Sequence, residues 1–264
     1  MTASGKPRVL IVNDDGIDGP GIKLLEELVG RFTDDIWVVA PDEERSGAGH
    51  SISVSHPIRL RQRDERHFAI KGSPTDCALL GIHELLDRKP DILFSGINAG
   101  PNLAEDITYS GTCSAAMEGA MLGIPSVALS QMLAYQQFVH WDTSRALLPP
   151  IIERLMTCDW QPGSFVNVNV PNLPVDQITG TRLTRQGRRP PGSYLPVRRV
   201  DERFVPYYWI KIAQQPGGTE PGTDLEAVRD GAVSITPLQL DMTDHAMAGG
   251  LERAFADLLG TAAA

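Results

Sequence analysis

Cysteine is scarce in this sequence, and its few residues are not paired. The 264 residues include three cysteines, Cys77, Cys113 and Cys158, none of which belongs to a Cys-x-x-Cys pair. An odd number of widely spaced cysteines is typical of reduced thiols, not of a disulfide framework. The first residues, MTASGKPR, lack the apolar run of a secretory signal, and no apolar stretch approaches membrane-spanning length. We therefore expect a cytoplasmic protein without a membrane partner.

Positive charge is also in short supply. The chain has 24 Lys and Arg against 33 Asp and Glu, which gives a formal net charge of −9. This balance argues against a protein that coats nucleic acid polymers or binds anionic membranes. A small anionic substrate stays compatible with it, because a bound metal ion can reverse the field inside one cleft.

Several catalytic and nucleotide-binding motifs are missing. No G-x-x-x-x-G-K-S/T sequence occurs, which argues against a P-loop nucleotide triphosphatase. No G-x-G-x-x-G follows the first predicted strand, which argues against a dinucleotide fold. The G-x-S-x-G elbow of an esterase is also absent, and none of the six histidines has zinc-ligand spacing.

Strand and helix signals alternate along the first half of the chain. The apolar run 9–12 predicts a buried parallel strand, and the apolar spacing over 20–32 predicts a helix with one core face. Further strands are predicted at 36–40, 91–98 and 126–130, and further helices at 74–86 and 112–122. Residues 51–70 predict shorter strands, as a hairpin off the main sheet. The alternation indicates an α/β fold with a doubly wound, mostly parallel sheet.

The second half of the chain has a looser pattern. Residues 186–222 are rich in Pro, Gly and Arg, which predicts an irregular extension or arm. A returning strand at 232–240 and a terminal helix at 244–259 are expected after it. We predict a single domain, 1–264, with its core in residues 1–135 and a β-rich C-terminal extension.

Two adjacent carboxylates, Asp14 and Asp15, fall where the first strand ends. Ligands of open α/β sheets bind beyond the carboxyl ends of the strands, and paired carboxylates there are costly to desolvate without a cation. Successive side chains on a straight strand point to opposite faces, but Gly16 permits a turn that brings the two together. The pair predicts a site for a hard divalent cation. The alternative is that one carboxylate caps the next helix and the other is solvated.

Asn98 and Ser46 are weaker candidates for the same site. Asn98 ends another predicted strand, and its amide oxygen could be a neutral ligand of such a cation. An asparagine there also commonly makes a turn by bonding its own backbone. Ser46 lies in the polar loop after the second strand, where a serine usually faces water.

The sequence YSGT, Tyr109 to Thr112, precedes a predicted helix. The free N–H groups and the positive end of that helix would form an anion site. Gly111 would let the backbone approach a phosphate, and Ser110 and Thr112 add hydroxyl donors. The alternative is a helix N-cap without a ligand.

A receiver domain of the two-component type is a structural rival, because it also opens with a buried strand that ends in two acids. Its acceptor aspartate would stand at the end of a later strand. Gly96 occupies that position here, which removes most of the support for this alternative.

Six motifs occur in order from Arg8 to His245. They are VNDDG, APDEERSGAGHS, GSPTDC, SGINAGPN, YSGT with AAMEG, and SITPL. Together they resemble the survival protein SurE family. The resemblance implies a Rossmann-like α/β core and assembly as a homodimer or homotetramer through C-terminal extensions. It also implies a metal-dependent 5'-nucleotidase that acts on nucleoside monophosphates, with 3'-nucleotides and short polyphosphate as further substrates.

The resemblance assigns roles to particular residues. It matches one divalent metal ion per subunit, Mg²⁺ or Mn²⁺, to the ligands Asp14, Asp15, Ser46 and Asn98. It matches the phosphate-contacting turn to Ser110, Gly111 and Thr112.

These roles imply a hydrolytic mechanism. The ion would draw charge from the phosphoryl oxygens and lower the pKa of a bound water. The proton of that water would pass to Asp14 or Asp15 as the catalytic carboxylate, or an aspartate would attack phosphorus itself. Asp241 and His245 reach the site only if the final strand returns to it, and a surface or capping role is their alternative. A non-catalytic nucleotide-binding regulator and a receiver-like signalling domain remain the alternative functions.

Overall fold

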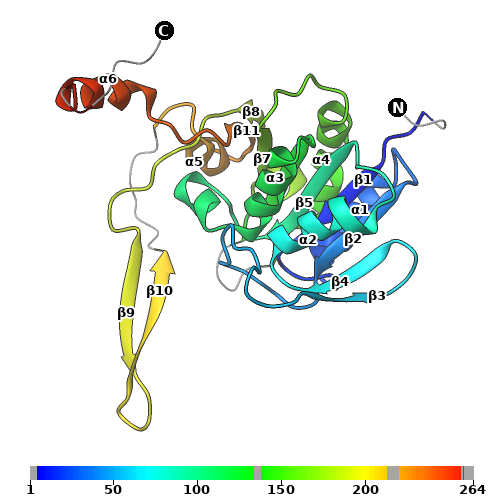
Figure 1. Ribbon diagram of the computed structural model, residues 1–264, viewed down its shortest axis with the longest axis horizontal. Coiled ribbons are helices and arrows are strands. Elements are labelled where there is room, and N and C mark those ends of the chain that lie inside the picture. The colour runs from blue at the N-terminus through cyan, green and yellow to red at the C-terminus, as the bar shows by residue number, and fades with distance from the viewer. Residues whose placement is uncertain (1–4, 134–137, 213–219, 257, 259–264) are drawn as a thin grey trace.

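The computed structural model describes residues 5–133, 138–212, 220–256 and 258. In these residues, one sheet has the strand order β3-β4-β2-β1-β5-β6-β7-β11-β8, and a separate hairpin is formed by β9 and β10 (Figure 1). The strands are β1 (Val9–Val12), β2 (Ile36–Pro41), β3 (Arg59–Gln62), β4 (His67–Lys71), β5 (Ile92–Ala99), β6 (Ser126–Gln131), β7 (Ser164–Val170), β8 (Gly180–Leu183), β9 (Tyr194–Val200), β10 (Pro206–Ile212) and β11 (Ala232–Gln239). The α-helices are α1 (Pro20–Val29), α2 (Pro74–Leu80), α3 (Gly111–Met121), α4 (Trp141–Leu155), α5 (Asp224–Arg229) and α6 (His245–Ala254). Short helical turns occupy Gly81–Leu85, Ala104–Thr108 and Val175–Gln177.

The main sheet is mostly parallel, which confirms the predicted fold class. β1 pairs in parallel with β2 on one side and with β5 on the other, and β6 pairs in parallel with β5 and β7. Among the strand pairs described for this sheet, β3 with β4 and β7 with β11 are antiparallel. The carboxyl ends of β1, β2, β5, β6 and β7 therefore lie along one edge of the sheet, where ligand sites of this architecture form.

Helices cover both faces of the sheet, because the central strands are apolar on both. In β1, Val9 and Ile11 pack in the core cluster of α1 and α4, whereas Leu10 and Val12 pack in the cluster of α2. Helix α1 begins with Pro20, a residue suited to the first turn, and its apolar stripe is buried as predicted. None of the helices in the described part of the chain is long and apolar enough to cross a membrane.

The hairpin predicted within residues 51–70 belongs to the main sheet, so its expected place off the sheet is wrong. β4 pairs in parallel with β2, and β3 forms the edge of the sheet with all of its residues exposed. The physical reason is that Phe68, Ala69 and Ile70 are all buried in β4. Consecutive buried residues are typical of a strand that is covered on both faces.

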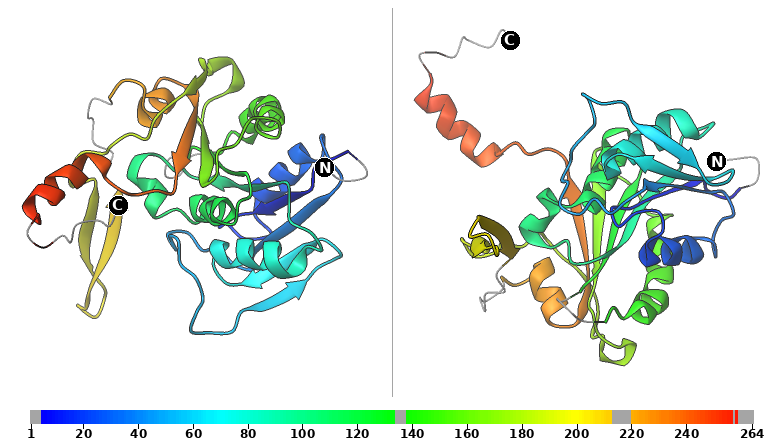
Figure 2. Two further views of the ribbon diagram at one scale, coloured as in Figure 1. Left: turned by 45° about the horizontal axis from the view of Figure 1, so that its top comes forward. Right: turned by 90° about the horizontal axis from the view of Figure 1, so that it is seen from below.

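The second half of the chain is more regular than its composition suggests. β11 lies between β7 and β8, so the main sheet continues well beyond residue 135. Residues 186–222, expected to be irregular, contain the antiparallel β9–β10 hairpin. This hairpin and α6 stand away from the main sheet in both views of Figure 2. The terminal helix, expected to reach Leu259, is described to Ala254, and residues 257 and 259–264 lie outside the described residues.

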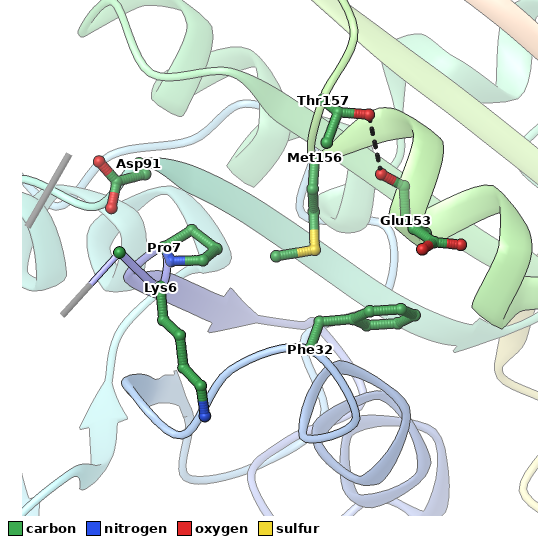
Figure 3. Close-up of a pocket in the computed structure, with 8 residues that line it drawn as sticks. Lys6, Pro7, Phe32, Asp91, Glu153, Met156 and Thr157 are labelled. Atoms are coloured by element: carbon green, nitrogen blue, oxygen red, sulfur yellow. Dashed lines mark hydrogen bonds between the residues drawn. The ribbon is translucent and has the colours of Figure 1, made fainter.

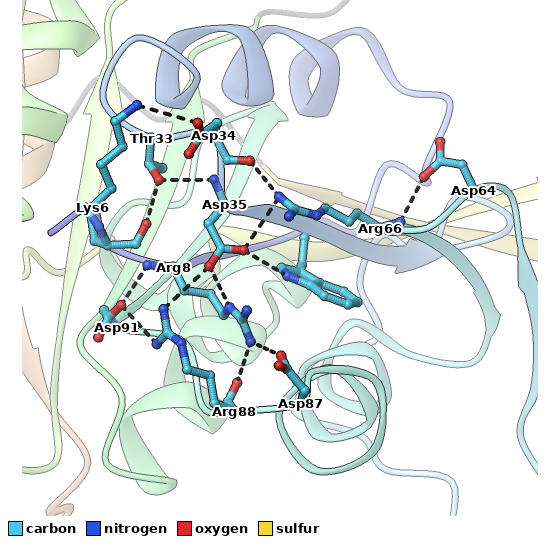
Figure 4. A network of polar contacts seen from close by, with 12 residues as sticks. Lys6, Arg8, Thr33, Asp34, Asp35, Asp64, Arg66, Asp87, Arg88 and Asp91 are labelled. Atoms are coloured by element: carbon cyan, nitrogen blue, oxygen red, sulfur yellow. Dashed lines mark hydrogen bonds and ion pairs between the residues drawn. The ribbon is translucent and has the colours of Figure 1, made fainter. Parts of the chain in front are cut away.

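A polar network closes the amino end of β1, opposite the carboxyl edge (Figure 4). Arg8 is buried, and its guanidinium donates to Asp35 at 2.8 Å and to Asp87. Asp35 also forms ion pairs with Arg66 and Arg88. The charges at this edge are thus engaged with one another and hold the strands together.

Candidate active site

The predicted acidic pair lies at the carboxyl edge of the main sheet. Asp14 and Asp15 follow β1, and Asn98 lies near the end of β5, the strand that pairs with β1. Gly16 has a φ of +92°, a left-handed conformation that favours glycine and turns the chain directly after the pair. The backbone N–H of Ala99 donates to Asp15 Oδ2 at 3.1 Å and so joins the ends of β1 and β5.

A cavity of about 310 Å³ at this edge brings most of the predicted site together. Asp14, Asp15, Ser46, Asn98 and Ser110 all line it. They come from the ends of β1 and β5, the loop after β2 and the residue before α3. Three parallel strands and one helix therefore converge on one small volume, at the edge where ligand sites of this architecture form.

Asp14 is held deep in this site by the first turn of α3. Its side chain is buried, and Thr112 Oγ1 donates to Asp14 Oδ1 at 2.6 Å. Burial raises the pKa of the Asp14 carboxyl above its ordinary value, and the hydrogen bonds from Thr112 oppose that shift.

Asp15 is less buried than Asp14, but its ionisation is also perturbed. Burial, followed by the negative charge of Asp14, raises the pKa of Asp15 to about 6. Glu44 from the loop after β2 adds a further negative charge that acts on both carboxyls. The site therefore concentrates negative charge at a partly desolvated point, which a cation would relieve.

The side chains at this point fit a hard divalent cation. Two carboxylates, an amide oxygen and a hydroxyl are oxygen ligands of the kind that Mg²⁺ and Mn²⁺ prefer. The Asn98 amide nitrogen donates to the Gly100 carbonyl at 3.0 Å. This bond uses the nitrogen of the amide, so the Asn98 side-chain oxygen stays available as a ligand. Ser46 is exposed, and its hydroxyl donates to Glu44 Oε1 at 2.8 Å. In the part of the chain that the structure describes, no group of three His, Cys, Asp or Glu could hold a metal ion, so a cation here needs amide or hydroxyl ligands too.

The amino end of α3 packs directly on Asp14. Ser110 is the N-cap, and its hydroxyl accepts from the Cys113 N–H at 3.0 Å. A Cβ added at Gly111 would lie 2.8 Å from Asp14 Cβ and 2.9 Å from Pro74 Cγ. The sequence predicts Gly111 as a point of approach for phosphate, whereas the structure places Asp14 against it. Gly111 and Thr112 stand behind Asp14, and Ser110 is the member of the turn that lines the cavity.

The loop after β2 forms one wall of the site and is anchored at both ends. The Arg45 N–H donates to the Asp14 carbonyl at 2.8 Å. Farther along, Ser53 donates to Asp76 through its N–H at 2.9 Å and its hydroxyl at 2.7 Å. Asp76 also completes a capping box with Ser73 at the start of α2. The GSPTDC motif therefore fixes this loop and does not itself line the cavity.

The cavity also contains residues that the sequence reasoning did not select. The polar and aromatic ones are Glu44, Asn102, Asp106, Tyr109 and Tyr194. Glu44, Asn102 and Tyr109 belong to the motifs APDEERSGAGHS, SGINAGPN and YSGT, and Asp106 lies between the last two, so proximity in sequence could have found them. Tyr194 belongs to the extension at 186–222, and no local pattern indicates that this segment returns to the carboxyl edge.

The other candidates lie elsewhere or lack the required group. Gly96 in β5 has a φ of +137°, and a Cβ there would lie 2.3 Å from the Leu129 carbonyl oxygen, so an acceptor aspartate would not fit. Asp241 and His245 are exposed and pair with each other at 3.3 Å. Asp241 lines a different cavity together with Arg185, so the structure does not bring this pair to the candidate site.

A second cavity, of about 350 Å³, is lined by Lys6 and Pro7, which precede β1, and by residues of other segments (Figure 3). Phe32 and Met156 contribute apolar walls, and Asp91 lies at its margin. The Asp91 carboxylate already accepts from the Arg8 N–H at 2.6 Å and from Arg88. Asp91 is therefore already engaged by Arg8 and Arg88. The carboxyl edge, with its adjacent carboxylates, remains the candidate site.

Comparison with known proteins gives consistent matches over nearly the whole chain. The family model described as survival protein SurE matches residues 9–192. A 5'-nucleotidase SurE from Mesorhizobium japonicum is 44% identical over 252 residues, which cover 94% of this chain and 100% of that protein. One from Paramagnetospirillum magneticum is 47% identical over 249 residues, which cover 94% of this chain and 95% of that protein. A crystal structure of a SurE protein from Aquifex aeolicus matches with a TM-score of 0.82 and 39% identity, covering 94% of this chain and 99% of the other.

Proposed function

The chain belongs to the survival protein SurE family, and from this premise we propose that it is a metal-dependent 5'-nucleotidase. Its substrates are nucleoside 5'-monophosphates, with 3'-nucleotides and short polyphosphate as further substrates. The observation that carries the proposal is the carboxylate pair Asp14 and Asp15 at the carboxyl end of β1, which shares one cavity with the Ser110 cap of α3. Relatives at 44% and 47% identity that bear the name 5'-nucleotidase SurE support the reaction type.

The proposed cofactor is one Mg²⁺ or Mn²⁺ per subunit, held by Asp14, Asp15, Asn98 and Ser46. Such an ion, when bound, withdraws charge from phosphoryl oxygens and makes a nearby water easier to deprotonate. Ser46 has to turn from Glu44 toward the two aspartates to act as a ligand, and its exposed position in the loop permits that movement.

The remaining steps rest on the side chains of the cavity. The Ser110 hydroxyl, which lines the cavity, binds the phosphate oxygens, and the positive end of α3 stabilises the charge that increases there in the transition state. Thr112 holds Asp14 in place by donating its hydroxyl, and this hydrogen bond opposes the rise in the Asp14 pKa that burial causes. Asp15 accepts the proton of the attacking water at the carboxyl oxygen that Ala99 does not engage.

The test is a phosphate-release assay across nucleoside monophosphates, with Mn²⁺, with Mg²⁺ and after treatment with EDTA. We expect release of inorganic phosphate from 5'-monophosphates, its loss with EDTA and its recovery when metal is added back. Binding of nucleotides without phosphate release would contradict the proposal and favour the non-catalytic regulator. A stable covalent phosphoryl group, detected by intact mass, would favour the receiver-like alternative.

A reducing, cytoplasmic location and a homo-oligomeric state complete the proposal. The three cysteines are unpaired, and Cys77 and Cys113 are buried. Among the described residues, no helix or sheet packs over the β9–β10 hairpin. Its side chains Tyr208, Trp209 and Ile210 are therefore each more than half exposed. A two-stranded hairpin is marginal alone, and clustered exposed apolar side chains commonly form interfaces. We propose that this hairpin contacts another copy of the chain in a dimer or tetramer.

Trp209→Glu should lower the oligomeric mass measured by light scattering. The substitution places a charge in the apolar surface of the hairpin, which disfavours its burial between subunits. Met121→Glu is the matched control, because Met121 is equally exposed on α3 and lies outside the hairpin. An unchanged mass for Trp209→Glu, or an equal decrease for both variants, would contradict an assembly role of the hairpin.

A further inference from the structure

Two tyrosines from distant segments meet at the rim of the candidate site. Tyr109 immediately precedes the Ser110 cap of α3, and Tyr194 is the first residue of β9. Their ring centroids are 5.3 Å apart with an interplanar angle of 55°. Both line the same cavity as Asp14 and Asp15. Tyr109 is 56% exposed, so its ring has a face open to an incoming group.

The Tyr194 ring is fixed in place by a buried acid. Its hydroxyl donates to Asp106, which also accepts from Arg189 Nε at 3.1 Å. Asp106 is 7% exposed and sits in the helical turn Ala104–Thr108, just before Tyr109. This arrangement orders the ring without a substrate, so little conformational entropy is lost when a planar group packs on it. The segment that carries Tyr194 is thereby docked at the carboxyl edge.

We propose that Tyr194 and Tyr109 form an aromatic platform on which the base of a nucleotide substrate stacks while its phosphate lies at Asp14, Asp15 and Ser110. The inference rests on the proposed nucleotidase function. It adds the residues that distinguish nucleotides from phosphate esters without a base. Stacking on tyrosine accepts any base, because every base presents a π-face.

Asn102 is a polar residue that lines this cavity, but its hydrogen bonds engage it elsewhere. The Asn102 amide nitrogen donates to Ser130 Oγ at 2.8 Å, and the Asn102 backbone N–H and carbonyl bond Asn169 and Asn167. Asn102 is 5% exposed, so it is engaged in holding the loop. The platform should therefore bind purine and pyrimidine monophosphates with little discrimination.

The experiment compares Tyr194→Ala and Tyr194→Phe on nucleoside 5'-monophosphates and on ribose 5-phosphate, which lacks a base. Loss of one stacking ring should raise KM for every nucleotide by about 10-fold in Tyr194→Ala, with kcat changed by no more than about twofold. KM for ribose 5-phosphate should stay within about twofold of the wild type, because that substrate makes no stacking contact. Tyr194→Phe keeps the ring and should keep KM for nucleotides near the wild-type value.

Two further variants separate stacking from a structural effect. Phe138→Ala removes an exposed aromatic ring that lies outside both the hairpin and the cavity, and it should leave KM for both substrate classes unchanged. Tyr109→Ala truncates the other, more exposed ring and should raise KM for nucleotides even if Tyr194→Ala does not fold. An equal rise in KM for nucleotides and ribose 5-phosphate would overturn the platform, and so would an unchanged KM in both Tyr109→Ala and Tyr194→Ala.

The outcome also distinguishes this inference from the proposed function. Phosphate release by the wild type without a nucleotide-selective effect of the tyrosines would refute the platform alone. If the wild type releases no phosphate, the proposed function fails. The platform is then tested by calorimetric binding of the same nucleotides and of ribose 5-phosphate to the wild type and to both alanine variants. A nucleotide-selective loss of affinity would support it, and equal affinities across these proteins would refute it.

Discussion

Asp15→Asn should reduce kcat for nucleotide hydrolysis by about 10³-fold or more, even at saturating Mn²⁺. The substitution removes one negative ligand of the proposed cation and the group that accepts the proton of the attacking water. An amide of the same size keeps the shape of the site and can still accept from the Ala99 N–H, so the fold should persist. Phosphate release under metal saturation measures the loss of the catalytic carboxylate apart from weaker metal binding.

The same variant should be more stable than the wild type in the absence of metal. Burial and the charge of Asp14 raise the pKa of Asp15 to about 6, so the folded protein binds more protons than the unfolded chain between about pH 4 and pH 6. The free energy of unfolding therefore falls as the pH rises through this range and Asp15 becomes ionised. Above this range the destabilisation caused by the ionised Asp15 is fully present. Near neutral pH we expect Asp15→Asn to raise the free energy of unfolding by about 2–3 kcal/mol, measured with urea. The difference should close toward about pH 4, where the aspartate is protonated.

A neighbouring aspartate provides the control for both measurements. Asp18 is exposed and paired with Arg63, whose hydrogen bond is the main cause that lowers the pKa of Asp18. Asp18→Asn should therefore leave kcat within about twofold of the wild type and should not stabilise the protein. Near-normal turnover of Asp15→Asn, or a loss of stability in that variant at neutral pH, would show that Asp15 is not the strained catalytic carboxylate.

Much of this site was predictable because parallel strands bring their ends to one edge. The buried run Val9–Val12 predicts β1, and a carboxylate pair that follows it must lie at the carboxyl edge of the sheet. Asn98 follows from the same rule, since its strand pairs with β1. The starts of the helices predicted at 74–86 and 112–122 were also local signals, and α2 and α3 begin at Pro74 and Gly111 in the structure.

The parts that sequence did not predict depend on contacts between distant segments. Tyr194 reaches the cavity through Asp106, 88 residues away, and nothing in the composition of the extension indicates that contact. The position of β11 between β7 and β8 likewise depends on pairing partners that an alternating pattern does not specify. Thr112 was expected to face a phosphate, and only the packing of α3 on β1 shows that its hydroxyl faces Asp14.

Gly111→Ala should lower kcat/KM by about 100-fold, although it adds a single methyl group. The new Cβ would lie 2.8 Å from Asp14 Cβ, 2.9 Å from Pro74 Cγ and 3.1 Å from Asp14 Oδ2. Atoms at these distances overlap, so Asp14 or the first turn of α3 must move. A displacement of about 1 Å in a catalytic constellation is enough for a loss of this size. Metal affinity should fall too, because the same movement weakens the Thr112 hydrogen bond to Asp14.

The cause of that loss can be separated from a general effect of alanine in place of glycine. Gly250→Ala is the matched control, because Gly250 lies in α6 with no atom within 4 Å of an added Cβ, and alanine there should be neutral or stabilising. Adding Pro74→Ala to Gly111→Ala relieves the contact with Pro74 but not the contact with Asp14, so activity should stay low. Recovery of activity in this double variant would assign the effect to Pro74 and α2. Normal kcat/KM in Gly111→Ala alone would mean that the close packing of α3 on Asp14 is not needed for catalysis.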